Sequence, residues 1–205
     1  MRGRDLKRIL SSPRLLAHSI RAWAYELRHP NHPWWAPSAI RFLDSELDRD
    51  ARVFEWGSGR STLWLSERVG SLTSIEHIPD WFRKVEGMLA EAGADNVELR
   101  LAELPTDEAA FGDAFWEPNP YTTAADQQPD ESLDLVIVDG ACRMPCAWRA
   151  LPKIAPGGLL LIDDTLHIGS VEAWKIPSEW ELVHGTGPGV WSTTIWRKPP
   201  LELAD

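Results

Sequence analysis

The chain has 205 residues, of which 43% are hydrophobic and 25% are charged, so disordered and fibrous classes are excluded and one globular domain is expected. Its uncharged apolar runs, such as Leu159–Ile162, are much shorter than the ~20 residues that a membrane-spanning helix needs. Its formal net charge of −10 disfavours DNA or RNA as a partner, because the phosphate backbone is also negative.

The beginning of the chain is basic, unlike the rest. Over Met1–Arg28 the Lys and Arg residues outnumber Asp and Glu, and apolar residues recur at near-helical spacing. A basic amphipathic helix of this kind is able to lie on an anionic membrane or contact a partner, and it is equally able to pack over its own acidic domain. The opening residues lack the apolar stretch of a secretory signal, so we expect a cytoplasmic protein.

A loop and a second short helix are expected next. The prolines of HPNHPWWAP (His29–Pro37) break helical geometry, and Ser38–Leu47 then has the pattern of a helix. Residues 1–50 are therefore predicted to form a helical extension or cap, and residues 51–205 the main domain.

From Ala51 onward, short apolar strands alternate with helices. The predicted strands are Ala51–Trp56, Ser71–His77, Val97–Ala102, Leu133–Gly140 and Gly157–Asp164, and the predicted helices are Ser61–Val69, Trp81–Ala92 and Ala141–Ile154. The polar stretch from Pro105 to Ser132 indicates a loop with a short helix. Continuous apolar strands separated by helices are typical of a parallel sheet buried on both faces, so the fold class is α/β, doubly wound and Rossmann-like.

Two cysteines, Cys142 and Cys146, lie on the last of these helices. Their spacing places both thiols on one face, but two thiols alone are an incomplete zinc site. We expect them to be buried, reduced core residues.

The last two strands break the alternation. Trp180–Thr186 and Val190–Lys198 are separated only by Gly187, Pro188 and Gly189, a turn too short for the crossover helix that parallel strands require. These strands must therefore pair antiparallel as a hairpin at the end of a mostly parallel sheet.

This order of elements resembles the class I S-adenosylmethionine-dependent methyltransferases, whose seven-stranded sheet ends in such a hairpin. The resemblance covers roughly Ala51–Lys198 and is carried by FEWGSGRST (Phe54–Thr62), by VDG with Cys142, and by PGG and the paired Asp163 and Asp164. It implies the cofactor S-adenosylmethionine and an enzyme that transfers its methyl group.

The first motif places two glycines where a strand turns into a helix, so that the backbone is able to approach a ligand closely. It resembles the family's glycine motif, with Ser61 in place of the third glycine, and implies cofactor contacts from Glu55, Gly57, Ser58, Gly59, Ser61 and Thr62. A dinucleotide fingerprint would need glycine at Thr62, so a nicotinamide or flavin enzyme is disfavoured. Taken alone, the motif is also consistent with a simple tight turn.

A carboxylate at the end of the next strand strengthens this interpretation. Glu76 follows Gly57 by 19 residues, where it is able to accept both ribose hydroxyl hydrogens of an adenosyl group. The same resemblance assigns His77, Glu103 and Asp139 to the cofactor site, with Glu103 facing the adenine amino group.

Three carboxylates follow the fourth and fifth strands. Asp139, Asp163 and Asp164 would repel one another without a proton or cation, so Mg²⁺ held by all three is one alternative and a metal-free site is the other. Asp139, Asp164 and His167 are the candidates for a general base, and a surface histidine without a catalytic role is equally consistent with the sequence. Arg143 could hold an anionic acceptor or pair with the nearby acids.

The acceptor itself is not identified by the sequence. The loop with Trp34 and Trp35 and the segment Phe111–Tyr121 are aromatic and polar enough to line a pocket for a small molecule. We therefore expect methyl transfer to oxygen or nitrogen of a small-molecule acceptor. A non-catalytic adaptor with the same fold and an aminopropyltransferase that uses the decarboxylated cofactor are the alternatives, and the oligomeric state is left open.

Overall fold

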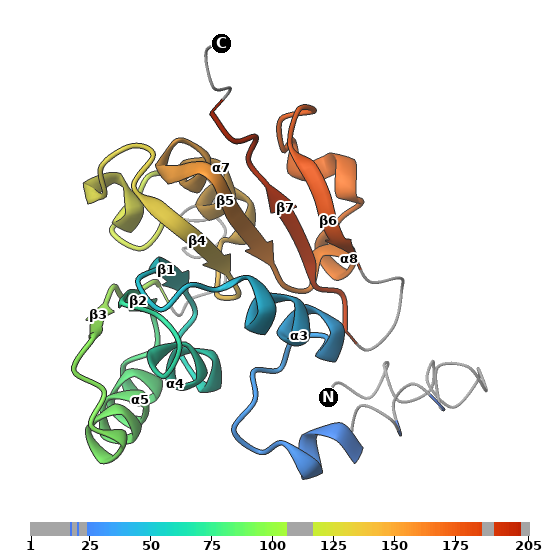
Figure 1. The fold of residues 1–205 in the computed structure, drawn as a ribbon. Helices are drawn as coiled ribbons and strands as arrows, with labels where there is room; N and C mark the ends of the chain where they lie inside the picture. The colour runs from blue at the N-terminus through green and yellow to red at the C-terminus, as the bar shows by residue number, and fades with distance from the viewer. Residues whose placement is uncertain (1–16, 18–19, 21–23, 106–116, 186–190, 202–205) are drawn as a thin grey trace.

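The computed structural model describes residues 17, 20, 24–105, 117–185 and 191–201. Seven strands form one sheet in the order β3-β2-β1-β4-β5-β7-β6 (Figure 1). They are β1 (Arg52–Trp56), β2 (Ser71–Glu76), β3 (Val97–Leu101), β4 (Leu133–Val138), β5 (Ile154–Ile162), β6 (Glu181–Gly185) and β7 (Thr194–Arg197). The first five are parallel, whereas β7 is antiparallel to both β5 and β6, which confirms the predicted fold class and hairpin.

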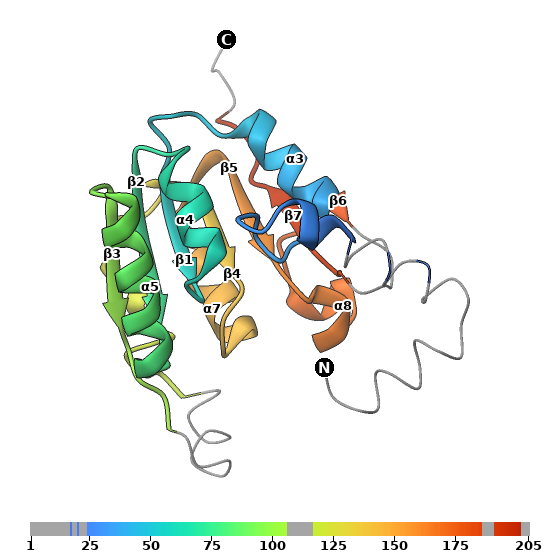
Figure 2. The ribbon, with the colours of Figure 1, turned by 90° about the horizontal axis from the view of Figure 1, so that it is seen from below.

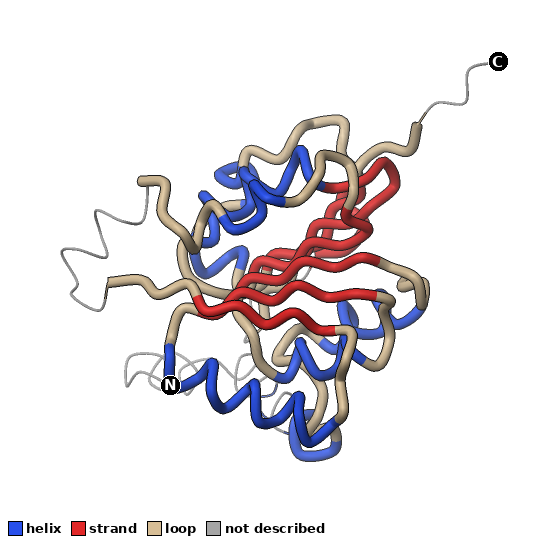
Figure 3. Tube along the Cα trace, turned by 90° about the vertical axis from the view of Figure 1, so that its left-hand side faces the viewer, coloured by secondary structure: helices blue, strands red, loops and turns tan. Residues whose placement is uncertain are grey.

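Helices cover both faces of this sheet (Figure 3). They are α3 (Pro37–Glu46), α4 (Arg60–Ser66), α5 (Pro79–Ala92), α7 (Arg143–Ala150) and α8 (Thr165–Ile168), with single 3₁₀ turns at Ala124–Gln127, Leu151–Lys153 and Val171–Trp174. Figure 2 shows α4 and α5 side by side on the same face as α3. None of the helices in the described ranges is long and apolar enough to span a bilayer.

Each face of the sheet has its own apolar core. Successive side chains of β1 point to opposite faces of the sheet: Phe54 and Trp56 pack with α7 in one core, and Val53 packs with α3 and α4 in the other. Both cores need apolar side chains from the same strand, and this is why the central strands lack the polar alternation of a sheet with one solvated face. Trp35 and Leu43, both 0% exposed, belong to the second core, so α3 packs into the same core as the sheet.

The boundaries of the predicted helices differ from the structure most in the helix after β4. The helix after β4 begins at Arg143 because Cys142 adopts a left-handed backbone with φ of 47°, and it ends at Ala150 because Pro152 lies in a 3₁₀ turn. Strand β5 then begins at Ile154, three residues before the predicted Gly157. Both cysteines are buried free thiols, as predicted.

Much of the N-terminal prediction falls outside the described residues. The described part of the predicted first helix is helical at 24–28. The proposed membrane or partner contact of Met1–Arg28 stays a prediction, and so does the division of the chain at residue 50.

Candidate cofactor and acceptor site

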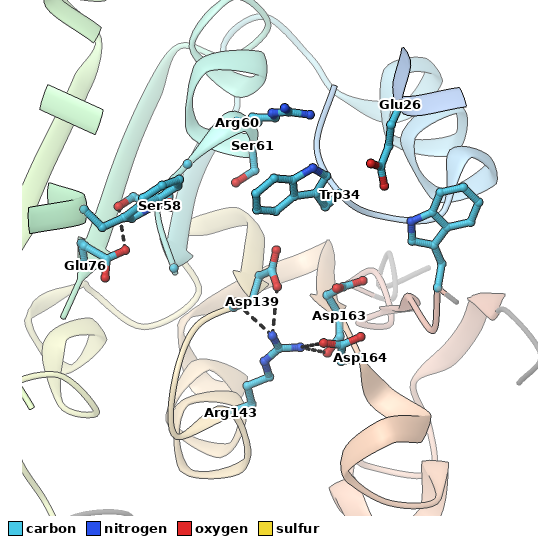
Figure 4. A pocket seen from close by; sticks show the side chains of 14 residues that line it. Glu26, Trp34, Ser58, Arg60, Ser61, Glu76, Asp139, Arg143, Asp163 and Asp164 are labelled. Carbon is cyan, nitrogen blue, oxygen red and sulfur yellow. Dashed lines mark hydrogen bonds and ion pairs between the residues drawn. The ribbon is translucent and has the colours of Figure 1, made fainter. Parts of the chain in front are cut away.

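A cavity of about 470 Å³ lies along the carboxyl edge of the parallel strands (Figure 4). It runs from the end of β2, across the ends of β1 and β4, to the end of β5, and the N-terminal segment closes one side. The residues that line it are Glu26, Trp34, Gly57, Ser58, Gly59, Arg60, Ser61, Glu76, Trp81, Asp139, Arg143, Asp163, Asp164 and Trp191. Ligands of open α/β sheets bind at this edge.

The glycine turn after β1 forms the floor of the cavity. Gly57 has φ of +93°, and a Cβ atom there would lie 2.6 Å from the backbone nitrogen of Gly140. Only glycine fits this position without strain, because the backbones after β1 and β4 almost touch. The Gly57 amide donates to the carbonyl of Ile75 at 2.9 Å, so the turn is also tied to β2.

Glu76 lies beside this turn with 3% of its surface exposed. One carboxylate oxygen accepts the backbone amides of His77 at 2.7 Å and Ile78 at 2.8 Å, and the other accepts the Ser58 hydroxyl at 3.1 Å. Burial raises the pKa of Glu76, but hydrogen bonds from His77 and Ile78 outweigh it, and the net pKa is lowered. Glu76 is therefore a fixed, ionised acceptor that faces the cavity.

Glu55 supports the turn from behind and does not line the cavity. Its side chain is 0% exposed, and one oxygen accepts the hydroxyls of Thr62 at 2.6 Å and Ser74 at 2.7 Å. Thr62 in turn accepts the Gly59 amide at 2.8 Å at the start of α4. Glu55 and Thr62 thus belong to a buried network that holds the glycine turn in shape, and the cofactor contacts expected for them stay a prediction.

Trp81 and the residues after β2 and β3 flank the Glu76 end. The Trp81 indole lines the cavity and donates to the Ser58 carbonyl at 2.7 Å. His77 is outside the lining, with its ring 5.3 Å from the Tyr121 ring. Glu103 is exposed on the loop after β3 and does not line the cavity either.

At the end of the cavity opposite Glu76, Arg143 forms ion pairs with the acids that follow β4 and β5. Its guanidinium donates to the Asp139 carboxylate at 3.1 Å and lies 3.4 Å from the Asp164 carboxylate. It also donates to the backbone carbonyls of Gly140 at 2.9 Å, of Asp139 at 3.1 Å, and of Asp163. Of the two roles expected for Arg143, the structure shows the pairing with nearby acids.

Comparison with known proteins shows which solved structures share this fold. No family model matches the chain, and no curated protein matches it. A methyltransferase-like protein from Silicibacter pomeroyi is 22% identical, with a TM-score of 0.58 and coverage of 83% of this chain and 91% of that chain. An rRNA methylase from Streptococcus thermophilus is 15% identical, with a TM-score of 0.59 and coverage of 79% and 95%.

A methyltransferase candidate from Streptococcus mutans, solved in complex with S-adenosylhomocysteine (SAH), is 14% identical, with a TM-score of 0.57 and coverage of 80% and 98%. The chain has the class I methyltransferase fold. Within this fold the sheet order, the terminal hairpin and the cavity at the strand ends agree with the resemblance found in the sequence.

The three acids do not fit the predicted Mg²⁺ site. Among the described residues no group of three metal-ligating side chains comes together. The physical reason is visible in Figure 4: the Arg143 guanidinium lies between Asp139 and Asp164 and supplies the cation that relieves their repulsion. Asp163 turns its carboxylate to the Thr193 hydroxyl at 2.5 Å. The metal assignment of Asp139, Asp163 and Asp164 is therefore corrected.

The N-terminal segment contributes more to this methyltransferase-fold cavity than the sequence predicted. Trp34 is 53% exposed and lines the cavity, whereas Trp35 is 0% exposed and donates its indole hydrogen to Asp139 at 2.9 Å. The Ala36 amide donates to the Thr193 hydroxyl at 3.0 Å, and this hydroxyl donates to Asp163. Sequence reasoning did not assign Glu26, Arg60 or Trp191 to the site. Arg60 lies inside the FEWGSGRST motif, whereas no motif marks Glu26 and Trp191.

The three residues expected from the sequence as candidates for a general base stay predictions. Asp139 and Asp164 line the cavity and remain the candidate bases. His167 belongs to the short helix α8, and its role as a base stays a prediction.

Asp163 should make the folded protein less stable as the pH rises. Burial raises its pKa to about 8, and the neighbouring Asp139 and Asp164 act in the same direction. The folded protein then keeps a proton that the unfolded chain loses near its ordinary pKa of about 4, so unfolding becomes easier between those values by up to about 1.4 kcal/mol per pH unit. We expect Asp163→Asn to flatten this decline in urea unfolding from pH 5 to 8. An equally steep decline in the variant would contradict the assignment to Asp163.

Proposed function

We propose that the chain is an S-adenosylmethionine-dependent methyltransferase that acts on oxygen or nitrogen of a small-molecule acceptor. The observation that carries this proposal is the contact between the glycine turn and Glu76 at one end of a continuous cavity. The Ser58 hydroxyl lies 3.1 Å from the Glu76 carboxylate, and both residues line the cavity. A turn that admits a ligand closely and a fixed carboxylate beside it are suited to a ribose diol.

The described residues fit the cofactor at its other charged groups as well. Arg60, the first residue of α4, lines the cavity with its guanidinium 5.0 Å from the Trp34 ring. It forms no ion pair with the described acids, so it is available to the methionine carboxylate. The bound cofactor supplies an electrophilic methyl group on a sulfonium, and the cavity acids and indole rings complement that positive charge.

The remainder of the cavity supports an acceptor site next to the methyl group. Methyl transfer is an in-line displacement, and it depends mainly on holding the acceptor opposite the sulfur. Asp139, held by Trp35 and Arg143, is a positioned carboxylate able to orient an acceptor hydrogen. Burial raises the pKa of Asp139 to about 6, although Arg143 opposes this, so it is a base near neutral pH.

Calorimetric titration of the purified protein with SAH and S-adenosylmethionine tests the proposal. We expect micromolar binding of both ligands with one site per chain. Absence of binding by the folded protein would contradict the proposal and favour a non-catalytic module.

The same titration with decarboxylated S-adenosylmethionine tests the aminopropyltransferase alternative. Because Arg60 is available to the cofactor carboxylate, the decarboxylated ligand should bind about tenfold more weakly, and Arg60→Met should abolish this preference. Arg83→Met is the control, since Arg83 is an exposed residue of α5 outside the cavity. Tighter binding of the decarboxylated form would favour the alternative enzyme.

A further inference from the structure

The cavity extends well beyond the proposed nucleoside site. Past Asp139 it is bounded by Glu26 and Trp34 from the N-terminal segment, by Asp163 and Asp164 after β5, and by Trp191 before β7. We call these five residues the far half of the cavity. In Figure 4 the Trp34 ring lies between the glycine turn and the Glu26 side chain, so the far half begins at this ring.

Arg143 does not offer free hydrogen bonds to a ligand in the far half. Its side chain is only 14% exposed, and its nitrogens already donate to the carbonyls of Gly140, Asp139 and Asp163 and to the Asp139 carboxylate. Its charge is also matched, because it contacts both Asp139 and Asp164. An anionic acceptor would find this guanidinium occupied.

One further carboxylate in the far half, that of Glu26, has no cationic partner at ion-pair distance among the described residues. Glu26 is only partly buried, and no hydrogen bond or ion pair joins it to the rest of the described chain. Asp163 is 7% exposed and accepts the neutral Thr193 hydroxyl, and because burial raises its pKa to about 8 it adds little negative charge near neutral pH. Glu26 therefore adds to the far half a negative charge that no described cation balances at ion-pair distance.

The aromatic walls favour the same kind of ligand. Trp34 is 53% exposed, which is unusual for so large an apolar side chain, and its ring already attracts one cation, the Arg60 guanidinium. Trp191 closes the other side and contacts the Tyr25 ring with 6.3 Å between centroids. Indole faces beside carboxylates attract ammonium groups, whereas they attract neutral alcohols less and carboxylates not at all.

We propose that the acceptor is a cationic amine that binds in the far half and is methylated on nitrogen. This inference rests on the proposed function. The bound ammonium loses one proton to solvent, and the nitrogen lone pair then forms a bond to the methyl carbon as the bond from carbon to sulfur breaks. The sulfur keeps that electron pair and becomes the neutral thioether of SAH, while the product nitrogen carries the positive charge.

Three ligands of similar shape test this preference: phenethylamine, 2-phenylethanol and phenylacetate. We expect titrations monitored by amide NMR to give at least about tenfold tighter binding of the amine than of the alcohol, with phenylacetate weakest. Glu26→Gln should reduce the preference by several-fold without changing SAH affinity. Trp34→Leu, which keeps an apolar side chain but removes the ring, should reduce the preference as well. Glu86→Gln on α5 is the matched control, because Glu86 is exposed and outside the cavity.

The titrations are run with and without saturating SAH, so that two failures are distinguishable. If SAH does not bind, the proposed function fails and the inference of a methyl acceptor fails with it, while the ligand preference of the free protein still shows whether the far half prefers a cation. If SAH binds but the alcohol or phenylacetate binds as tightly as the amine, the inference of a cationic acceptor is overturned while the proposed function stands. Unchanged preference in both Glu26→Gln and Trp34→Leu would also overturn it.

Discussion

Replacing Glu76 by glutamine is expected to weaken SAH binding by about tenfold to a hundredfold while the fold stays intact. A hydrogen bond to a charged group contributes about 1.5 to 3 kcal/mol, and a neutral amide cannot accept both hydrogens of a ribose diol as a carboxylate does. Glutamine keeps one carbonyl oxygen for the amides of His77 and Ile78, so the local backbone retains its partners. Calorimetric titration with SAH measures the effect.

The substitution Glu86→Gln is the control, since it makes the same chemical change on the exposed face of α5. Thermal unfolding should show that both variants remain folded. Equal SAH affinity in Glu76→Gln and the unsubstituted protein would remove Glu76 from the site and with it the main support for the proposed function.

The order of strands and helices was predictable because it depends on local patterns. The apolar run Leu135–Val138 predicts a buried strand, and the short connection before β7 predicts antiparallel pairing. Both predictions were confirmed. The start of the helix after β4 was not predictable to the residue. Cys142 adopts a left-handed backbone there, and this depends on packing against the rest of the chain rather than on cysteine's own preference.

The candidate site was predictable only where a motif and a strand end coincide. Gly57 and Glu76 are of this kind, and the structure brings them together at one end of the cavity. The repulsion among the acids after β4 and β5 was anticipated, and pairing with Arg143 was one of two roles expected for that residue. The sequence could not decide between the two roles, because it does not specify how closely Arg143 approaches the acids from the following helix. Trp34 and Trp35 are neighbours with opposite exposures, and only tertiary packing distinguishes them.

We expect Gly57→Ala to destabilise the folded protein, because Gly57 lies in the glycine turn where the backbones after β1 and β4 meet. The new methyl group would lie 2.6 Å from the Gly140 nitrogen and 2.8 Å from the Asp139 carbonyl carbon, and φ of +93° is unfavourable for any residue with a Cβ. Backbone atoms cannot move aside as a flexible side chain can, so β1 and β4 would have to separate at the cavity floor. We expect the free energy of unfolding in urea to fall by about 3 kcal/mol or more.

Gly93→Ala separates steric conflict from the backbone preference of glycine. Gly93 also has a positive φ of +65°, at the end of α5, but a Cβ there would have no neighbour within 4 Å. Its substitution should therefore cost only the left-handed backbone preference, about 1 to 2 kcal/mol. If Gly57→Ala were no more destabilising than Gly93→Ala, the close approach of the backbones after β1 and β4 would not contribute to stability. If Gly57→Ala were much more destabilising, the contact between the ends of β1 and β4 would be what holds Ser58 and Asp139 in place at the cavity floor.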